Sequence, residues 1–386
     1  MYTFRCLNNI SRIGLDKFTD VYTESNSEDV DAILVRSANM KEMALPESVK
    51  CIARAGAGVN NIPVEECAEQ GIVVFNTPGA NANGVKELVI AGMLLASRDI
   101  VGGIEWLEKQ ETTEDLPKRV EKQKKQFAGH EISGKKLGII GLGAIGVMVA
   151  NAATSLGMDV YGYDPFISVN AAWNLSRAIH HVTDLTEIYS QCDYITIHVP
   201  LSNDTRGMIG ADAIAQMKEG VVVLNFARDG LVDETAIVAA LTSGKVRKYV
   251  TDFITPAIAK APNTLVTPHL GASTEESEDN CAVMAVQAVR DYLENGNIKN
   301  SVNYPACDLG SCNTVGRIAI NHRNIPNMIA QFAAVLAGDN VNIANFSNKN
   351  RGAYAYSIID TDSALTEKVA DELRAIEGVL KVRIVK

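Results

Sequence analysis

Two residues in the second half of the chain occupy positions where chemistry could take place. Arg228 follows the hydrophobic segment 221–226 after Ala227, and the chain then turns at Asp229 and Gly230. His269 has a similar place in residues 267–274, ahead of another predicted helix. A histidine there can titrate near neutral pH and so take part in proton transfer. The alternative is that His269 only caps the helix that follows.

A glycine-rich turn at residues 141–146 predicts a dinucleotide cradle between a hydrophobic strand and the apolar helix at residues 147–156. Gly141 permits the tight turn, and Gly143 lets backbone N–H groups approach a pyrophosphate. Gly146 lets the helix and the strand pack closely, and the start of the helix attracts the anion.

The acidic residue Asp164 supports this interpretation. It ends the hydrophobic strand 158–163 and lies 23 positions beyond Gly141. A carboxylate at that place binds the ribose hydroxyls and repels a 2′-phosphate, so the sequence favours NAD over NADP.

Residues 137–158 carry no charge and are long enough for a membrane span, but four glycines by position 146 argue against one.

Two arginines in the first hundred residues are candidates for binding a substrate anion. Arg36 ends the predicted strand 32–36, Arg54 ends the predicted strand 51–54, and small residues follow both. In open α/β sheets ligands bind beyond the carboxyl ends of strands, where a guanidinium can hold a carboxylate or phosphate by two hydrogen bonds. The alternative is that each arginine is a surface residue that pairs with an acid or closes a helix.

The hydrophobic pattern around these residues is that of a chain alternating strands with helices. Buried parallel strands are predicted at residues 32–36, 51–54, 72–75, 158–163, 194–199, 221–226 and 249–252. We therefore predict an α/β fold with two doubly wound, Rossmann-like domains, the second on a six-strand sheet. Helix capping explains the turn-rich loop at residues 76–83 as well as a functional role does. The charged segment 105–126 indicates a solvated helix or connecting arm.

Length and composition set the class of protein. At 386 residues with 47% hydrophobic residues, the chain can form two or three cores. Its net charge of −10 argues against binding to nucleic acid or to an anionic membrane. The start of the chain has no signal-peptide pattern, so we expect a cytoplasmic protein. Its seven cysteines fit neither a disulfide framework nor a zinc site, so we expect no metal.

Five motifs together resemble the D-isomer-specific 2-hydroxyacid dehydrogenases, over roughly residues 1–305. They are residues 141–146, Asp164, residues 198–200, residues 225–228 and residues 268–272. Residues 54–58, 76–78 and 269–274 look most like the branch of that family that acts on D-3-phosphoglycerate. The resemblance implies an NAD-dependent dehydrogenase that takes a phosphorylated 2-hydroxy acid in serine biosynthesis.

The resemblance also implies a role for each matching residue. Arg228 and His269 are the expected catalytic residues: the arginine holds the substrate carboxylate and polarises the C2 oxygen, and the histidine takes the hydroxyl proton. The expected substrate-binding residues are Arg36, Arg54, Ala57 and Gly58. The expected cofactor-binding residues are Gly141, Gly143, Ala144, Ile145, Gly146, Asp164, Val199, Pro200, Phe226, Ala227, Asp252, Gly271 and Ala272.

The chain departs from the family pattern after Asp252. The family usually has a glutamate a few residues further on, which pairs with the catalytic histidine, but residues 253–259 contain no carboxylate. Either another acid such as Glu275 or Glu276 approaches His269, or the histidine works without a carboxylate partner. A histidine without that partner is protonated less readily.

The tail of the chain has its own pattern. Residues 314–386 predict strands and helices in the order βαββαβ, which resembles an ACT regulatory domain. In serine-sensing copies of that domain, a histidine and two asparagines bind the effector, and the matching residues here are His322, Asn324 and Asn342. The alternative is that these residues only cap and turn the chain.

The expected organisation follows from these motifs. It comprises a substrate-binding domain at residues 1–95 completed by residues 281–302, an NAD-binding domain at 96–280, a linker at 303–313, and an α+β regulatory domain at 314–386. A serine-regulated protein with such a tail is expected to be a homodimer or homotetramer. Two other functions stay open: a dehydrogenase for glyoxylate, hydroxypyruvate or another unphosphorylated acid, and an NADH-sensing interaction protein.

Overall fold

The computed structural model describes all 386 residues, and the contacts between them divide the chain into two units. The split unit consists of Met1–Asn81 together with Glu275–Lys386, and the central unit consists of Ala82–Thr274. Each unit has sheets and hydrophobic cores of its own.

The central unit is built on one seven-stranded parallel sheet. In spatial order its strands are β12 (Thr264–Val266), β11 (Val246–Thr251), β10 (Val221–Asn225), β9 (Tyr194–Ile197), β6 (Lys136–Ile140), β7 (Asp159–Tyr163) and β8 (His180–Val182). Chain order reverses between β6 and β9, so the predicted doubly wound sheet is confirmed. The sheet has one strand more than the six expected. The short edge strands β8 and β12 lack the long apolar run of a central strand, because one side of each has no neighbour to bury it.

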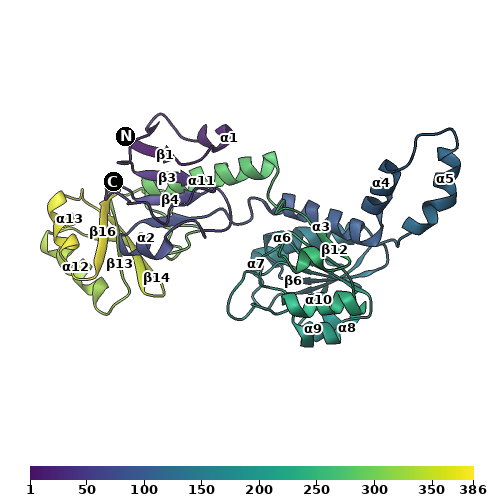
Figure 1. The fold of residues 1–386 in the computed structure, drawn as a ribbon. Coiled ribbons are helices and arrows are strands. Elements are labelled where there is room, and N and C mark those ends of the chain that lie inside the picture. The colour runs from purple at the N-terminus through teal and green to yellow at the C-terminus, as the bar shows by residue number, and fades with distance from the viewer. The chain divides into compact units, whose positions relative to one another are not determined.

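Helices cover both faces of this sheet (Figure 1). Helices α3 (Ala82–Ser97) and α6 (Ala144–Ser155) pack on one face, and α8 (Leu185–Gln191), α9 (Ala211–Gln216) and α10 (Glu234–Ser243) pack on the other. The short helices α7 (Val169–Trp173) and η2 (Ile258–Lys260) lie in connections. The carboxyl ends of all seven strands therefore stay together at one edge, where loops can meet a ligand.

The first part of the split unit is a five-stranded parallel sheet. In spatial order its strands are β2 (Tyr22–Glu24), β1 (Tyr2–Cys6), β3 (Ala32–Val35), β4 (Cys51–Arg54) and β5 (Val73–Phe75), with helices α1 (Arg12–Leu15), α2 (Val64–Glu69) and α11 (Glu275–Asn295). Val286, Val289 and Leu293 of α11 are fully buried against this sheet. The long helix thus returns the chain from the central unit to complete the first core.

The contact boundaries fall at 81/82 and 274/275, whereas the sequence suggested 95/96 and 280/281. Helix α3 belongs to the central unit because Val89 and Met93 are buried beside Leu224 and Val250 of the central sheet. Residues 303–313 are also more ordered than a linker would be. Tyr304 is fully buried, and its hydroxyl donates a hydrogen bond of 2.7 Å to the Ala68 carbonyl.

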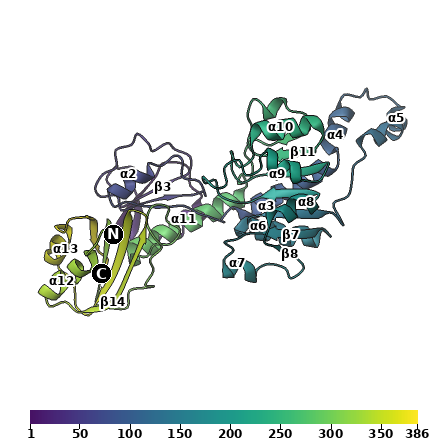
Figure 2. The same ribbon diagram turned by 90° about the horizontal axis from the view of Figure 1, so that it is seen from below.

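The tail has the predicted βαββαβ order. Its elements are β13 (Gly316–Arg323), α12 (Met328–Gly338), β14 (Ile343–Arg351), β15 (Tyr354–Thr361), α13 (Glu367–Arg374) and β16 (Val379–Ile384), and the antiparallel sheet runs β14-β15-β13-β16. Figure 2 shows α12 and α13 together beside this sheet, where Phe332 and Leu373 fill a core against it.

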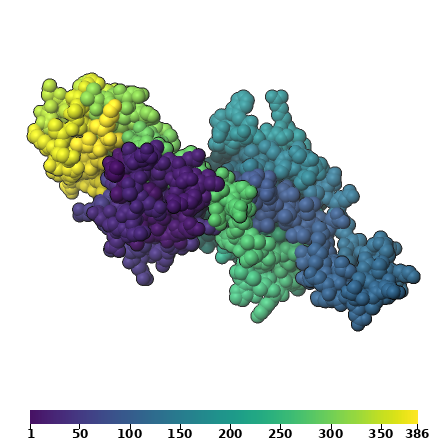
Figure 3. All heavy atoms as spheres, turned by 90° about the horizontal axis from the view of Figure 1, so that it is seen from above, coloured from purple at the N-terminus to yellow at the C-terminus, as the bar shows by residue number.

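The other face of the tail sheet packs on the remainder of the split unit. Tyr356 and Ile358 share a core with Phe75 and Tyr292, and the Tyr356 hydroxyl donates to the Gly296 carbonyl at 2.7 Å. Figure 3 shows the C-terminal residues lying directly against the N-terminal segment. The tail and the five-stranded sheet therefore form one packed body.

The charged segment forms a helical arm, as the sequence predicts. It consists of α4 (Ile100–Glu108), α5 (Leu116–Gln123) and the short helix η1 (Lys124–Phe127), and none of its residues is buried. None of the helices in the structure has both the length and the apolar character that crossing a bilayer requires.

Candidate active site

The glycine cradle lies between β6 and α6, and its backbone explains why glycines are needed there. Gly141 has φ of 97°, and a Cβ on it would lie 2.6 Å from the His198 carbonyl oxygen. A Cβ on Gly146 would lie 2.0 Å from the Gly141 carbonyl oxygen, so only a glycine lets helix and strand approach this closely. A Cβ on Gly143 would meet open space instead.

The start of α6 faces this open space with unpaired backbone donors. Gly143 is the N-cap residue, and its carbonyl accepts the hydrogen bond of Val147 N–H at 3.1 Å. The N–H groups of Ala144 and Ile145 precede that first bond and have no acceptor inside the helix. A pyrophosphate fits these residues because it is an anion that accepts several hydrogen bonds at a helix N-terminus.

Asp164 is fixed beside the cradle by backbone hydrogen bonds. Its two carboxylate oxygens accept from Leu142 N–H at 2.8 Å and Phe166 N–H at 2.9 Å. Each oxygen keeps a further lone pair, so the carboxylate can also accept ribose hydroxyls. Val199 lies against the turn, because a Cβ on Gly141 would come within 2.9 Å of its side chain.

The backbone around Arg228 is held by a buried asparagine. Asn225, 1% exposed, accepts a hydrogen bond from Ala227 N–H at 3.1 Å and donates one to the Arg228 carbonyl at 2.9 Å. The Arg228 guanidinium lies at the exposed end of the loop and donates to the Ala227 carbonyl at 2.7 Å. Phe226 packs in the core beneath, so the sequence motif serves both to position the arginine and to support the loop.

The loop that carries His269 is held by Asp252. This carboxylate is 4% exposed and accepts hydrogen bonds from the Thr267 hydroxyl, from Leu270 N–H at 2.9 Å and from Gly271 N–H at 2.8 Å. His269 itself has φ of 56°, a conformation that costs energy for a residue with a Cβ and persists only where neighbouring groups enforce it. Asp252 supplies that enforcement, which sequence spacing could not reveal.

The imidazole of His269 is exposed and contacts Phe253 edge-on, with ring centroids 5.3 Å apart. Within the central unit it forms no ion pair with a carboxylate. Glu275 and Glu276 begin α11 in the split unit, so their approach to His269 stays a prediction. Phe253 was missed by the sequence analysis, although it directly follows Asp252.

Topology brings the chemically important residues of the central unit to one place. Arg228 follows β10, Asp252 follows β11 and His269 follows β12, and these three parallel strands are neighbours. Their carboxyl ends lie at the same edge as the glycine cradle after β6. His198 follows β9 at this edge, and burial lowers its pKa to about 4, so it is a neutral residue here.

The arginines of the split unit also share an edge. Arg36 follows β3 and pairs with Glu278 of α11 at 2.5 Å, both side chains being 43% exposed. Arg54 ends β4, and its Nε donates to the Arg36 carbonyl at 2.9 Å. A Cβ on Gly58 would lie 2.8 Å from Arg54 Nη1, so the glycine makes room for the guanidinium. The Asn76 amide donates to the Ala57 carbonyl at 2.7 Å and fixes this loop.

The three effector candidates lie at different ends of the tail sheet. His322 is 2% exposed, and its ring nitrogens lie 2.9 Å from the Arg323 carbonyl and 3.1 Å from Asn348 Oδ1; burial lowers its pKa. Asn324 donates to the Gly352 carbonyl at the same end of the sheet. Asn342 donates to Asp362 beyond β15, at the opposite end. One chain therefore does not bring the two asparagines together.

Comparison with known proteins supports a dinucleotide-binding site in the central unit. Residues 90–271 match the model of the NAD binding domain of the D-isomer specific 2-hydroxyacid dehydrogenases. A D-3-phosphoglycerate dehydrogenase of Haemophilus influenzae is 30% identical over 372 residues, which cover 92% of this chain and 87% of that protein. The chain belongs to the D-isomer specific 2-hydroxyacid dehydrogenase family.

Other relatives show the same family relationship. A D-3-phosphoglycerate dehydrogenase of Methanocaldococcus jannaschii is 38% identical over 287 residues, 72% of this chain and 52% of that protein. The chain spans about half the length of the first curated relatives that it matches. The NAD+-bound 3-phosphoglycerate dehydrogenase of Entamoeba histolytica superposes with a TM-score of 0.60 at 27% identity, covering 78% of this chain and 98% of that one. A glyoxylate reductase of Paecilomyes thermophila gives 0.64 at 27% identity, with the same coverage.

Proposed function

We propose that the chain oxidises D-3-phosphoglycerate at C2 with NAD, which yields 3-phosphonooxypyruvate, NADH and a proton. The observation that carries the proposal is the placement of Arg228 and His269 at the same sheet edge as the glycine cradle. The relatives named D-3-phosphoglycerate dehydrogenase support the choice of substrate. The open space at Gly143 and the free donors of α6 support the choice of cofactor.

Each group at the site has a part in this reaction. When bound, NAD supplies a hydride acceptor at its nicotinamide ring. His269 takes the proton of the C2 hydroxyl, and Arg228 holds the carboxylate and stabilises charge on the C2 oxygen. Asp252 positions the His269 loop through its three hydrogen bonds.

We assign the phosphate of the substrate to the arginines of the split unit. Arg36 and Arg54 lie at the carboxyl ends of adjacent strands, and the Ala57–Gly58 turn leaves room beside Arg54. Two guanidinium groups suit a phosphate because each can donate two parallel hydrogen bonds. Glu278 occupies one of those positions on Arg36, so the phosphate replaces this exposed ion pair when it binds.

The proposal is tested by following NADH formation with 3-phosphoglycerate beside glycerate, lactate and 2-hydroxyglutarate. Glycerate is the matched control because it differs from 3-phosphoglycerate only by the phosphate. We expect 3-phosphoglycerate to have the highest kcat/KM, and Arg54→Gln to raise the KM for it while changing glycerate turnover little. A preference for unphosphorylated acids would favour the alternative represented by the glyoxylate reductase, and NADH binding without turnover of any acid would favour a sensor protein.

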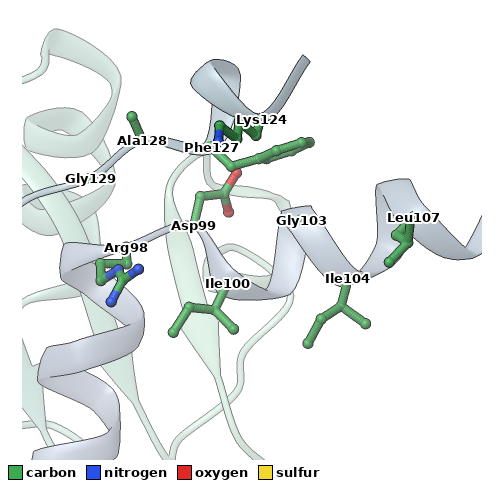
Figure 4. Close-up of a pocket in the computed structure, with 10 residues that line it drawn as sticks. All are labelled: Arg98, Asp99, Ile100, Gly103, Ile104, Leu107, Lys124, Phe127, Ala128 and Gly129. Carbon is green, nitrogen blue, oxygen red and sulfur yellow. The ribbon is translucent and has the colours of Figure 1, made fainter. Parts of the chain in front are cut away.

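We propose further that the protein is a homo-oligomer whose helical arm contributes to the subunit contact. Ile100, Ile104 and Leu107 are 41–53% exposed and follow one another at helical spacing along α4 (Figure 4). With Phe127 they line a cavity of about 430 Å³. A second copy of the chain would cover these apolar side chains, and Ile104→Glu is expected to reduce the mass measured by light scattering.

We propose a cytoplasmic location on the basis of cysteine chemistry. All seven cysteines are free, and five of them are buried. Burial raises the pKa of the Cys51 and Cys67 thiols to about 12, so these groups are unreactive core residues. A chain that leaves every thiol unpaired fits a reducing compartment.

A further inference from the structure

A cleft of about 600 Å³ lies inside the split unit between the tail and the five-stranded sheet. Its walls come from the segment before β4, from the turn between α2 and β5, and from α13 and β16 of the tail. Leu45 and Leu380 give it apolar sides, and Glu47, Gln70, Arg374 and Lys381 give it polar ones. A cleft of this size, mixed in character, is typical of a site for a small metabolite.

The cleft lies at the opposite edge of the sheet from the substrate arginines. Glu47 precedes β4 and Ile72 precedes β5, so the cleft borders the amino ends of these strands. Arg36 and Arg54 lie at the carboxyl ends of β3 and β4. A ligand in the cleft therefore does not overlap the proposed substrate site.

The strand β16 places two cations on the face toward this region. Val382 and Ile384 point toward the helices of the tail, so the alternate residues Lys381 and Arg383 point toward the five-stranded sheet. Lys381 Nζ donates to the Val49 carbonyl at 2.7 Å and to the Glu47 carbonyl at 3.2 Å.

Both cations lack a carboxylate partner. Arg383 is 9% exposed and donates only to the carbonyls of Tyr292 and Leu293, at 2.6 and 3.0 Å. Neither Arg383 nor Lys381 forms an ion pair, unlike Lys50 nearby, which pairs with Asp31. Buried charge is normally neutralised by a partner, so this part of the fold carries excess positive charge.

The electrostatics of Lys381 agree with that excess. Burial lowers the pKa of its ammonium group to about 8, and the positive charges of Lys50 and Arg383 act in the same direction. Arg374 adds another cation at the cleft wall, where it is 43% exposed and paired with Asp371 and Glu367 at the surface of α13. Glu47 is the acid among the polar side chains of the wall, and Lys381 is the wall cation without an ion pair.

We propose that this cleft is a binding site for a small metabolite with an anionic group, a carboxylate or a phosphate, held between Lys381 and Arg374. The aliphatic wall around Leu45 and Leu380 accommodates the carbon skeleton of the ligand. Because the ligand touches both the tail and the loops that lead into β4 and β5, it links the regulatory tail to the sheet that carries Arg36 and Arg54. The site is separate from His322, whose ring contacts Phe332 on the helix-covered face of the tail sheet.

The test is calorimetric titration of the full chain with inorganic phosphate and, separately, with succinate. The variants are Lys381→Met, which keeps the apolar stem, and Lys381→Arg, which keeps the charge. Lys349→Met, on an exposed residue of β14, is the matched control. Loss of one charge-assisted hydrogen bond predicts binding about tenfold weaker or more for Lys381→Met, near-normal binding for Lys381→Arg and unchanged binding for the control.

The outcomes distinguish a phosphate ligand from a carboxylate ligand, and they show whether the cleft binds an anion at all. Binding of phosphate alone or of succinate alone identifies which group the site accepts, as long as Lys381→Met weakens it. Anion binding at the substrate arginines is the same in Lys381→Met and Lys349→Met, so it cancels in the comparison. Equal affinity of these two variants, or no binding of either anion by the wild-type chain, would overturn the proposal.

Discussion

At the scale of single residues, the glycines of the cradle have different tasks that a pair of variants can separate. Gly143 borders open space, whereas Gly146 touches the backbone of Gly141. Gly143→Ala is expected to preserve the melting temperature and to weaken NADH binding more than tenfold, because the new methyl group occupies the pyrophosphate space. Gly146→Ala is expected to lose about 1–3 kcal/mol of unfolding free energy through overpacking, and NADH binding with it. Fluorescence titration with NADH and thermal unfolding measure both, and normal NADH affinity in Gly143→Ala would contradict the cradle.

The two proposed catalytic residues make separable contributions. Arg228→Ala is expected to reduce kcat by about a hundredfold or more, because it removes the group proposed to stabilise charge at the C2 oxygen. His269→Ala is expected to reduce kcat by about a hundredfold to ten-thousandfold, the usual effect of removing a general base. Both variants should bind NADH normally, which serves as the control for folding. Turnover near the wild-type level in either variant would remove that residue from the mechanism.

At the scale of secondary-structure elements, the loop after β12 depends on the carboxylate that follows β11. Asp252→Asn keeps the shape but places an amide N–H₂ where a backbone N–H now donates, so one hydrogen bond of about 1–3 kcal/mol is lost. We expect kcat to fall about tenfold with little change in the KM for substrate, and the amides of Leu270 and Gly271 to exchange hydrogen faster. Asp204→Asn, in an exposed loop, is the control. Unchanged exchange at both amides would show that the loop does not depend on Asp252.

Strands buried on both sides could be predicted from sequence, and edge elements could not. Residues 51–54 and 221–226 are apolar runs because neighbours cover both faces of these strands, and the structure places β4 and β10 there. Strand β8, which begins with two histidines, has no such run. The hydrogen bonds by which Asn225 and Asp252 hold their loops could not be predicted either, because each depends on the direction of a side chain within a loop.

The docking of the tail strand β16 predicts an unusual pH dependence of stability. The pKa of Lys381 is about 8 in the folded chain, against 10.5 for a free lysine. Lys50, Arg383, Cys51 and Glu47 are the titratable or charged groups that act on it. Between about pH 8 and pH 10.5 the unfolded chain binds more protons at Lys381 than the folded chain does, so the contribution of Lys381 to stability rises with pH.

Comparison with Lys381→Met isolates this contribution from the other titrating groups. The difference in unfolding free energy, wild type minus variant, is expected to increase by on the order of 1–3 kcal/mol from pH 8 to 10.5. Urea unfolding at several pH values measures it, and Lys349→Met gives the baseline. A difference that stays flat across this range would show that Lys381 is not desolvated by docking.

At the scale of the whole molecule, the packing of the tail on the first sheet could not be predicted from the sequence. The sequence predicted both parallel sheets and the βαββαβ tail, but not the strands β1 and β2 of the first sheet. It did not reveal that the tail packs on the first sheet, because that contact joins Tyr356 and Ile358 to Phe75 and Tyr292, which are far apart in sequence. Cross-domain contacts of this kind depend on surface shape, which local periodicity does not encode. The tail therefore packs on the sheet whose strands β3 and β4 lead to Arg36 and Arg54, the proposed substrate-binding residues.

Serine is the proposed effector of the tail. His322 and Asn342 lie at opposite ends of one tail sheet, so a shared site needs the tails of two chains to pair with opposite ends adjacent. His322→Ala and Asn342→Ala are each expected to abolish serine binding, while a mixture of the two variants restores one site in each mixed dimer that joins a wild-type His322 to a wild-type Asn342.

Calorimetry tests both the serine site and its coupling to the proposed active site. If serine lowers the affinity for NADH or substrate by some factor, these ligands must lower serine affinity by the same factor, because coupling of binding free energies is reciprocal. Titration of serine with and without NADH and 3-phosphoglycerate measures that factor, and Lys349→Ala serves as the control on an exposed tail strand. Serine binding that survives both substitutions, or that is independent of the other ligands, would leave the tail as an assembly module without a feedback role.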